Sequence, residues 1–262
     1  MEKKYISKEE YKKEIIRILN HLGSKYGRFK VFEDLLYMLA CSISNAVDSV
    51  HYEGREETYV KLMSSYSLEE RMAFVDLTNL IISAMTVTMY SADLLGEIYH
   101  EMNLHNEHNG QFFTPINVCQ LMADIVVSDE DIKKRGYITV CEPTCGSGAM
   151  LIATANSLYS KNYNPNYNMC CFAVDNDIRC VLMTYIQLSL LGIPAVVVHG
   201  DTLTVKEFDR FYTPMYILGG WVWKEKLSLT DGFSLDDEKL RCATEPAYFL
   251  MKYGFNMDKS EV

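Results

Sequence analysis

A run of seven residues, Glu142 to Gly148, has the composition of a ligand-binding loop. The apolar run Tyr137 to Cys141 before it predicts a buried strand, and Ala149 to Tyr159 after it predicts a helix. Two glycines that flank a serine let the backbone turn tightly and approach a ligand, and the start of the next helix presents free N–H groups. The spacing is neither the dinucleotide-binding GxGxxG pattern nor a P-loop, which needs Lys-Ser or Lys-Thr after its second glycine. It predicts a ligand loop of another kind, and a glycine-rich structural turn is the alternative.

Carboxylates stand where two later strands are predicted to end. Asp175 follows the apolar run Cys170 to Val174, and Asp201 lies shortly after Ala195 to Val198. A carboxylate at a strand end can accept hydrogen bonds from a bound ligand, whereas an ordinary surface role is the alternative for such a residue. The position of Asp175 after the glycine loop favours contact with a ligand.

The elements that position these residues are short apolar runs alternating with amphipathic helices. Helices are predicted over Ile116 to Val127, Ala149 to Tyr159 and Ile178 to Leu191, between the strands named above. Such alternation implies an α/β fold with a parallel sheet that is covered on both faces. After about Thr204 the regular alternation fades.

The first hundred residues follow a different, purely helical pattern. One apolar stripe ends at Gly23, a second runs from Phe32 to Val47, and Ser67 with Glu70 forms a capping box before a third. We therefore expect a helical N-terminal domain of four or five helices over residues 1–105, followed by the α/β domain over residues 106–262.

Composition limits the classes of protein to consider. The chain has 262 residues, 48% of them hydrophobic, which is ample for a core. A net charge of −10 has the wrong sign for a protein that coats nucleic acid without help. No apolar run approaches the roughly 20 residues of a membrane span, and no signal peptide is evident, so we expect a cytoplasmic protein without a membrane partner. The eight cysteines form no paired CxxC units and are interpreted as reduced core thiols.

Two aromatic or titratable clusters have alternative interpretations. His100, His105 and His108 are dense enough to suggest a metal, but their spacing suits no single helical face and their neighbours are those of a solvated loop. We expect no metal there. Trp221 and Trp223 have the character of rings that stack on a base, although an alternating pair is more typical of an edge strand or a partner contact.

The glycine loop resembles motif I of the adenine-N6 DNA methyltransferases, most closely that of the modification subunits of type I restriction systems. Gly110 to Pro115 resembles the family's Gly-x-Phe-Tyr-Thr-Pro motif at the methionine end of the cofactor, and Asp93 to Tyr99 resembles the helix before it. Asp175 matches the ribose-binding acid, and Gly200 to Leu203 resembles a motif whose Asp accepts from the adenine amino group. The resemblance implies a Rossmann-like domain that binds S-adenosylmethionine through Phe113, Thr114, Glu142, Thr144, Cys145, Gly146, Ser147, Gly148, Asp175, Asn176, Asp201 and Thr202.

The catalytic motif of that family is altered in this sequence. Adenine-N6 methyltransferases carry (Asn/Asp/Ser)-Pro-Pro-(Tyr/Phe/Trp) after the fourth strand, where the polar side chain and a carbonyl accept from the target amine and the ring stacks on the flipped base. Here Thr213-Pro214-Met215-Tyr216 stands in its place, so the resemblance assigns catalysis to Thr213, Pro214 and Tyr216. A second candidate, Glu245-Pro246-Ala247-Tyr248, is interpreted as a loop before a helix.

Two functions follow from the resemblance. The first is a DNA adenine-N6 methyltransferase-like protein of restriction-modification or mobile-element type, which either takes DNA recognition from a partner subunit or dispenses with it. The second is a catalytically lapsed homologue that binds the cofactor and acts through protein contacts. Methylation of a small molecule or a protein is a third, less favoured interpretation. The sequence does not determine the oligomeric state or the role of the helical N-terminal domain.

Overall fold

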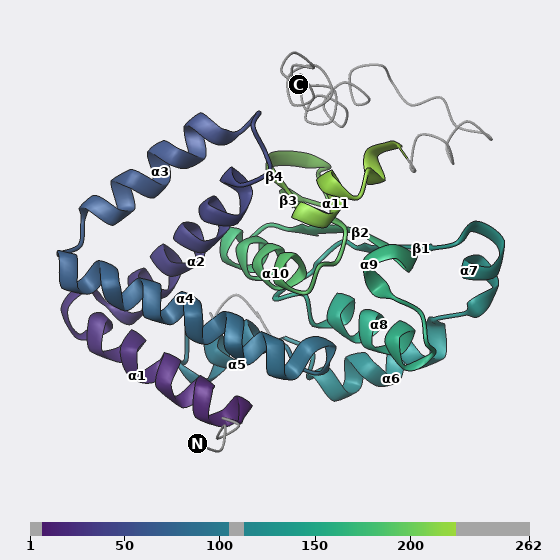
Figure 1. The fold of residues 1–262 in the computed structure, drawn as a ribbon, viewed down its shortest axis with the longest axis horizontal. Helices are drawn as coiled ribbons and strands as arrows, with labels where there is room; N and C mark the ends of the chain where they lie inside the picture. The colour runs from purple at the N-terminus through teal and green to yellow at the C-terminus, as the bar shows by residue number, and fades with distance from the viewer. Residues whose placement is uncertain (1–6, 105–112, 224–262) are drawn as a thin grey trace, which may run out of the picture.

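The computed structural model describes residues 7–104 and 113–223, and it divides them into an all-helical first part and an α/β second part (Figure 1). The first part contains α1 (Lys8–Tyr26), α2 (Arg28–Asn45), α3 (Tyr52–Ser64), α4 (Leu68–Thr88), the 3₁₀ turn η1 (Met89–Ser91) and α5 (Leu94–Glu101). The second part contains α6 (Ile116–Val126), α7 (Asp129–Arg135), β1 (Ile138–Glu142), α8 (Ala149–Ser160), α9 (Pro165–Asn168), β2 (Met169–Asp175), α10 (Ile178–Leu190), β3 (Ala195–Asp201), β4 (Lys206–Tyr212) and α11 (Pro214–Leu218).

Side-chain caps set the ends of several helices. The predicted capping box of Ser67 and Glu70 is present at the start of α4, and Ser7 with Glu10 forms a second one at α1. Gly27, with φ of 88°, separates α1 from α2, so the first helix runs beyond the end that was predicted at Gly23. The expectation of four or five helices is confirmed, since residues 7–104 contain five α-helices and one short 3₁₀ turn.

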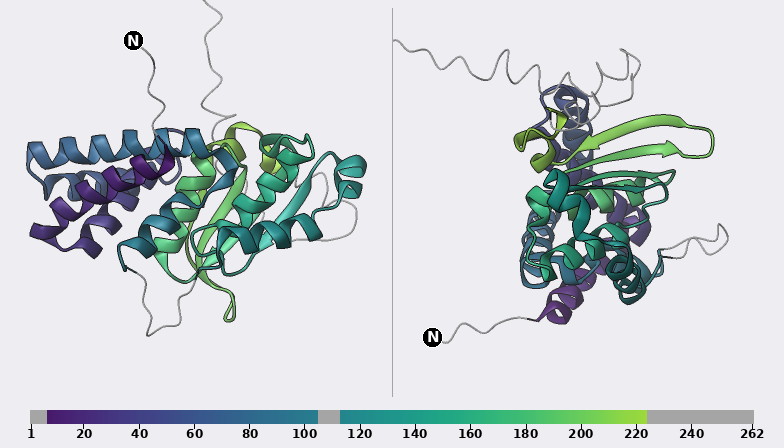
Figure 2. Two further views of the ribbon diagram at one scale, coloured as in Figure 1. Left: turned by 90° about the horizontal axis from the view of Figure 1, so that it is seen from below. Right: turned by 90° about the vertical axis from the view of Figure 1, so that its right-hand side faces the viewer.

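The sheet has four strands in the order β1-β2-β3-β4. The first three are parallel, with Glu142 beside Ala173 and Asp175 beside His199, as the alternating pattern predicted. β4 pairs antiparallel with β3, and Val196 lies beside Tyr212 at the end of that ladder. The hairpin of β3 and β4 projects from the body of the molecule (Figure 2), and its tip residues Leu203 and Val205 are highly exposed.

The α/β fold class is confirmed, but coverage of the two sheet faces is unequal. Helix α10 contacts β2 and β3, α8 contacts β1, and α2 packs on the outside of α10. On the other face, α11 and the buried Trp221 cover Cys170 and Val196. In the described part of the chain, Cys141 and Phe172 on that face stay exposed, so the prediction of two fully covered faces is correct for one face only.

Helices of the first part share a continuous hydrophobic core with the sheet. The same cluster of buried side chains includes Leu19 of α1, Leu36 of α2, Ile186 of α10 and Val197 of β3. Arg55 of α3 adds a polar tie, because its guanidinium donates to the carbonyl of Arg210 on β4 at 2.6 Å. Whether residues 1–105 fold as a separate domain stays a prediction.

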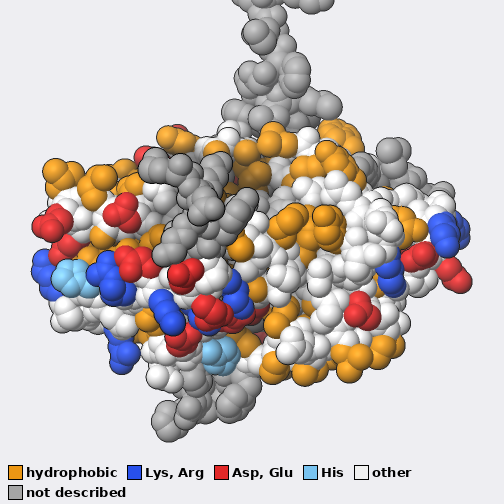
Figure 3. Space-filling view, turned by 60° about the horizontal axis from the view of Figure 1, so that its bottom comes forward, with side chains coloured by type: hydrophobic (Ala, Val, Ile, Leu, Met, Phe, Trp, Pro, Cys, Tyr) orange, Lys and Arg blue, Asp and Glu red, His pale blue; other side chains and the backbone are white. Residues whose placement is uncertain are grey.

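Apolar side chains are also concentrated on parts of the surface. Figure 3 shows them along the right and lower side of one face, while charged side chains gather mostly on the left. Helix α6 buries the small residues Cys119 and Ala123 against Ala149 and Ala153 of α8, which turns its larger residues, such as Ile125, towards solvent. By length and composition, with mean hydropathy of 1.5, the stretch Leu68–Ser91 passes the test for a membrane-crossing helix, contrary to the sequence expectation. One such helix is weak evidence for a membrane span, because core helices of soluble proteins share this length and composition; 28% of its 18-residue apolar window is buried.

Candidate functional site

Three carboxylates mark one end of the parallel sheet. Glu142, Asp175 and Asp201 are the last residues of β1, β2 and β3, which are neighbours in the sheet and run in the same direction. We call this end of the sheet the carboxyl edge. In open α/β sheets, ligands bind at the carboxyl ends of the strands, so the topology brings these predicted site residues to the place where a ligand is expected.

The glycine loop leaves β1 at the carboxyl edge and is held against β2. Gly146 has φ of 55° and Gly148 has φ of 94°, which are conformations that favour glycine. The amide of Gly146 donates to a carboxylate oxygen of Asp175 at 2.9 Å, and the Thr184 hydroxyl donates to the Gly146 carbonyl at 2.9 Å. A Cβ atom on Gly148 would lie 3.0 Å from Oγ1 of Thr184. The loop is therefore a shaped backbone turn, with Asp175 as one of its supports.

Phe113 brings the segment before α6 to the same place. Its ring stacks on Tyr99 at a centroid distance of 5.6 Å, and a Cβ on Gly146 would lie 3.3 Å from that ring. Thr114 follows it and is exposed, while Gly110, Gln111 and Phe112 lie outside the described residues. Phe113 therefore lies directly beside Gly146 of the glycine loop, although the two residues are far apart in the sequence.

Ser147 points into the protein rather than towards the carboxyl edge. It is buried, and its hydroxyl donates to the carboxylate of Asp93, which is also buried. Gln187 of α10 donates from Nε2 to Asp93 and to the Ser147 carbonyl, both at 2.8 Å. Ser147 was predicted to bind the ligand, but the structure makes it an anchor of the loop.

Asp93 and Gln187 are supporting residues that the sequence prediction missed. Asp93 caps α5 by accepting from the amide of Gly96 at 3.0 Å, and Gln187, interpreted from sequence as a packing residue, bonds to three groups. A Cβ on Gly96 would lie 2.1 Å from Asp93 Oδ2, so glycine is required there. The signal available in the sequence was an acidic residue directly before the apolar helical segment and a glycine three residues later.

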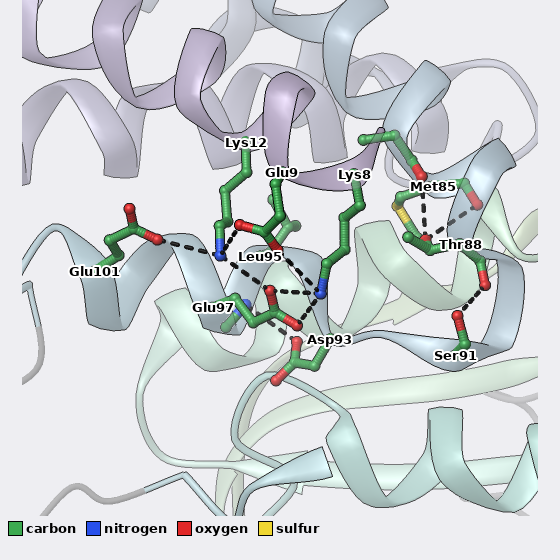
Figure 4. A network of polar contacts seen from close by, with 12 residues as sticks. Lys8, Glu9, Lys12, Met85, Thr88, Ser91, Asp93, Leu95, Glu97 and Glu101 are labelled. Carbon is green, nitrogen blue, oxygen red and sulfur yellow. Dashed lines mark hydrogen bonds and ion pairs between the residues drawn. The ribbon is translucent and has the colours of Figure 1, made fainter. Parts of the chain in front are cut away.

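Figure 4 shows that the helix capped by Asp93 is also tied to α1. Lys8 donates to Glu97 of α5 at 2.9 Å, and Lys12 lies 3.4 Å from Glu97 and 3.2 Å from Glu101. The side chain of Lys12 is largely buried, so this ion-pair network is screened less than a surface pair. A continuous set of polar contacts therefore joins α1, α5 and the glycine loop.

The environments of the carboxylates at the carboxyl edge differ. Burial raises the pKa of Glu142 and of Asp175 above the ordinary values, although backbone N–H groups bonded to each carboxylate oppose the rise. The pKa of Asp201 is lowered, chiefly because the Thr204 side chain and the amides of Thr204 and Leu203 donate to its carboxylate. Cys145 is not an activated nucleophile, since burial raises its thiol pKa.

The turn after β3 closes over the glycine loop. The Thr202 hydroxyl donates to the carbonyl of Pro143 at 2.6 Å, and Asp201 accepts from the amide of Leu203 at 2.9 Å. Thr144 is bonded through its amide to Glu142 at 3.4 Å, and the carbonyl of Asn176 lies 3.3 Å from the ring of His199. The segments that carry the predicted ligand-binding residues thus converge on one edge, but the side chains of Ser147 and Cys145 are buried in the protein.

The predicted catalytic residues lie at the opposite end of the sheet, and this placement corrects the prediction. Because β4 runs antiparallel to β3, it carries Thr213 back to the start of β3. The Thr213 hydroxyl donates to the Ile193 carbonyl and accepts from the Ala195 amide, both at 2.8 Å, and the side chain is fully buried. Pro214 begins α11, and Tyr216 is buried against Tyr212. These residues support the fold and do not face the carboxyl edge.

The remaining sequence candidates have structural roles or lie outside the described residues. His100 packs edge-on against Phe113, and His105, His108 and Glu245 to Tyr248 are not described. Within residues 7–104 and 113–223, no group of His, Cys, Asp or Glu is placed to hold a metal ion. Trp221 is buried against Tyr137, not on an edge strand. Of the cysteines described, Cys141 is exposed and the others are buried.

Comparison with known proteins gives a family match for part of the chain. Residues 90–239 match the family model of the N-6 DNA methylases. No curated protein matches the sequence. A solved structure from Listeria monocytogenes, described as a class I S-adenosylmethionine-dependent methyltransferase, is similar over 66% of this chain at 17% identity and a TM-score of 0.34. The similarity covers 54% of that protein, so the chain spans about half of its length.

Proposed function

The chain belongs to the N-6 DNA methylase family, and from this membership we propose that it binds S-adenosylmethionine at the carboxyl edge and serves adenine-N6 methylation of DNA. S-adenosylmethionine is the cofactor that family membership implies. The observation that carries the proposal is the convergence of Phe113, the glycine loop, Asp175 and Asp201 on one edge of the sheet.

The residues at this edge fit such a cofactor. The Asp175 carboxylate accepts backbone N–H groups of Gly146, Asp177 and Asn176, and its two oxygens together offer about four acceptor positions, which leaves capacity for a ribose hydroxyl. The carboxylates of Glu142 and Asp175 suit a ligand with a cationic sulfur. Glycine at 146, beside the ring of Phe113, leaves room for a ligand to approach the backbone. When bound, the cofactor supplies the methyl group.

We also propose a biological role, a source of DNA recognition and a location for the protein. We infer a restriction-modification or mobile-element role, related to type I modification subunits, from the glycine-loop and Gly110 to Pro115 motifs. DNA recognition comes from a partner subunit, because a net charge of −10 opposes unaided binding to phosphates. The setting is cytoplasmic, and residues 1–105 form a helical domain that positions α5 and thereby the glycine loop.

One observation favours the second function, a lapsed homologue that binds the cofactor and acts through protein contacts. Thr213 and Tyr216 lie buried at the far end of the sheet from Asp201, so they do not present a target amine to the cofactor. Under the first function, the acceptor for the target amine must come from a partner or from residues outside the described ranges.

Two measurements test these functions. Calorimetry with S-adenosylmethionine measures cofactor binding, which both functions predict, and the Asp175→Ala variant is expected to bind at least tenfold more weakly. Absence of binding by the native chain contradicts both. Transfer of a labelled methyl group to mixed-sequence DNA, with and without the products of neighbouring genes, separates them. Transfer supports the first function, whereas cofactor binding without transfer in either condition supports the second.

A further inference from the structure

Helix α4 is apolar on two opposite faces, and one of them is exposed. Its inner face packs Phe74, Leu77 and Ile81 into the core, and α1 lies against it. The outer face is a stripe whose members are all exposed in the part of the chain that the structure describes. The stripe, which we call the α4 seam, consists of Leu68, Met72, Val75, Asn79, Ile82, Thr86 and, in η1, Met89.

The spacing within the α4 seam is that of a helix-pairing surface. Successive members are separated by four and three residues in strict alternation, from Leu68 to Met89. Apolar residues that recur every 3.5 positions on average form the seam of two helices that wind around each other. Three of the apolar side chains, Leu68, Val75 and Ile82, are 76%, 45% and 42% exposed. An apolar face of this length normally contacts a partner.

The charges along α4 favour a particular orientation of that partner. The charged residues Glu69, Glu70, Arg71 and Asp76 all lie in the first half of the helix, and residues 77–88 contain none. In a parallel pair of α4 helices, the two acidic halves would lie side by side. In an antiparallel pair, each acidic half lies against an uncharged half, and the helix dipoles are opposed favourably.

The seam is self-complementary in the antiparallel orientation. A two-fold axis near Asn79 places Leu68 opposite the partner's Met89 and Val75 opposite the partner's Ile82. It also places Asn79 opposite the partner's Asn79, where each amide can both donate and accept. A shift by one heptad sets the amide against Met72 in one direction and against Thr86 in the other, so the centred register is the one that pairs the two amides.

We propose that a second copy of this chain binds along the α4 seam, antiparallel, in a two-fold dimer centred on Asn79. Such an isologous contact uses the same surface on both copies. A lipid surface fits less well, because membrane-surface helices carry Lys and Arg beside the apolar face, and this one carries Glu69, Asp76 and a single Arg71.

The size of the seam sets the strength of the dimer. At about 1.5 Å per residue and about 10 Å width, the 21 residues of α4 present about 300 Å². A standard stable interface buries about 800 Å² per partner, so a reversible dimer is expected. A groove of about 450 Å³ between α4 and α1, lined in part by Arg17, His21 and Asp76, borders the seam at Asn79 and can extend the contact.

A charge-exchange experiment tests both the partner and the orientation. Sedimentation velocity of the full chain from about 1 to 500 μM measures self-association and gives the dissociation constant of the dimer. Val75→Glu or Ile82→Lys alone is expected to weaken dimerisation at least tenfold. The double variant Val75→Glu/Ile82→Lys is expected to restore it, because each Glu then faces a Lys of the partner. In a parallel dimer the double variant would set like charges together, and no recovery would contradict the antiparallel arrangement.

Disulfide trapping tests the register independently. In a Cys141→Ser/Cys242→Ser background, oxidation of Asn79→Cys is expected to yield a covalent dimer, and Leu68→Cys alone is not. Leu68→Cys combined with Met89→Cys is expected to yield one again. Efficient trapping of Leu68→Cys alone would overturn the antiparallel register.

Two further outcomes would overturn the proposal as a whole. One is a monomer at every concentration, and the other is flotation with neutral phosphatidylcholine vesicles that is abolished by Ile82→Lys. The substituted side chains of the α4 seam are exposed, so circular dichroism is expected to show an unchanged fold.

Discussion

Asp93 and Ser147 lie 54 positions apart in the sequence, and their side chains share a buried hydrogen bond that joins the start of α5 to the glycine loop. The same carboxylate accepts from the Gly96 amide and the Gln187 side chain, so it organises three segments at once. Because Asp93 touches no reacting group, we regard it as a positioning residue for the proposed cofactor site.

Two substitutions of Asp93 distinguish the effect of its hydrogen bonds from the effect of its negative charge. Asp93→Ala leaves buried donors unpaired and is expected to lower the free energy of unfolding by about 1–3 kcal/mol. It is also expected to weaken cofactor binding by loosening Ser147. Asp93→Asn can keep the bonds, since its amide can donate to the Ser147 oxygen, and is expected to bind the cofactor nearly normally. Chemical denaturation and calorimetry measure the two effects, with the exposed Asp131→Ala as a control. Equal loss of binding in the Asn and Ala variants would contradict a positioning role.

The pH dependence of stability reports the ionisation of Asp93. Burial raises its pKa above the ordinary value of 3.8, so the folded state disfavours the charged form. The wild-type chain is therefore expected to lose stability as pH rises from about 3.8 through the raised folded pKa. Asp93→Asn lacks this titration. Denaturation midpoints of the native chain and of Asp93→Asn, measured across that pH range, should become more similar as the pH falls. A difference between the midpoints that is the same at all pH values would contradict the raised pKa of Asp93.

Asp175 is expected to affect both the loop and the ligand. Asp175→Ala removes the acceptor of the Gly146 amide and the proposed acceptor of ribose hydroxyls, so cofactor affinity should fall at least tenfold, or about 1.4 kcal/mol. Asp209→Ala, on the exposed part of β4, is the matched control and should leave affinity unchanged. Binding within twofold of the native value in Asp175→Ala would exclude a ligand role for this carboxylate.

Thr213 is expected to act on stability and not on cofactor binding. Thr213→Val removes the hydroxyl that bonds to Ile193 and Ala195, and should lower the free energy of unfolding by about 1–3 kcal/mol. Cofactor affinity should be unchanged, because the residue lies at the other end of the sheet. Thr139→Val, the same substitution at an exposed position of β1, should have little effect on either. A selective loss of methyl transfer in Thr213→Val, with stability retained, would restore its predicted catalytic role.

Arg55 is expected to hold the helices against the sheet. Its guanidinium pairs with the buried Asp48 at 2.9 Å and donates to the Arg210 carbonyl, so Arg55→Ala leaves a buried carboxylate without this partner and should cost about 3–5 kcal/mol. Thermal and chemical unfolding measure the cost, and the exposed Arg17→Ala serves as control. A change no larger than that of the control would show that the pair is not needed.

The ion pair of Asp48 and Arg55 predicts a dependence of stability on pH whose sign is opposite to that of Asp93. Burial alone would raise the pKa of Asp48, but the bond and charge of His51 and the charge of Arg55 lower it below 3.8. The resulting stabilisation is fully present above the unfolded value and is lost as pH falls towards the lowered pKa. Asp48→Asn should therefore lose its deficit relative to the native chain in acid. Parallel acid titrations of the two chains, followed by circular dichroism, measure this.

The sequence by itself determined the fold class, the positions of β1 to β3 and of α6, α8 and α10, and the glycine loop. These features depend on local periodicity and on residues such as Gly146 and Gly148, whose backbone conformations are encoded where they stand. Alternation of strands and helices implies that these strands run parallel, so the convergence of their last residues Glu142, Asp175 and Asp201 on one edge was also predictable.

Only the tertiary structure decided where Thr213 and Ser147 point. The pattern of apolar residues after Thr204 is too weak to predict the β-hairpin of β3 and β4. The antiparallel direction of β4 nevertheless places Thr213 at the far end of the sheet. Ser147 turns inward because Asp93, distant in sequence, offers it a buried acceptor. Neighbouring residues cannot report strand direction or contacts between distant segments, because both depend on the packing of the whole chain.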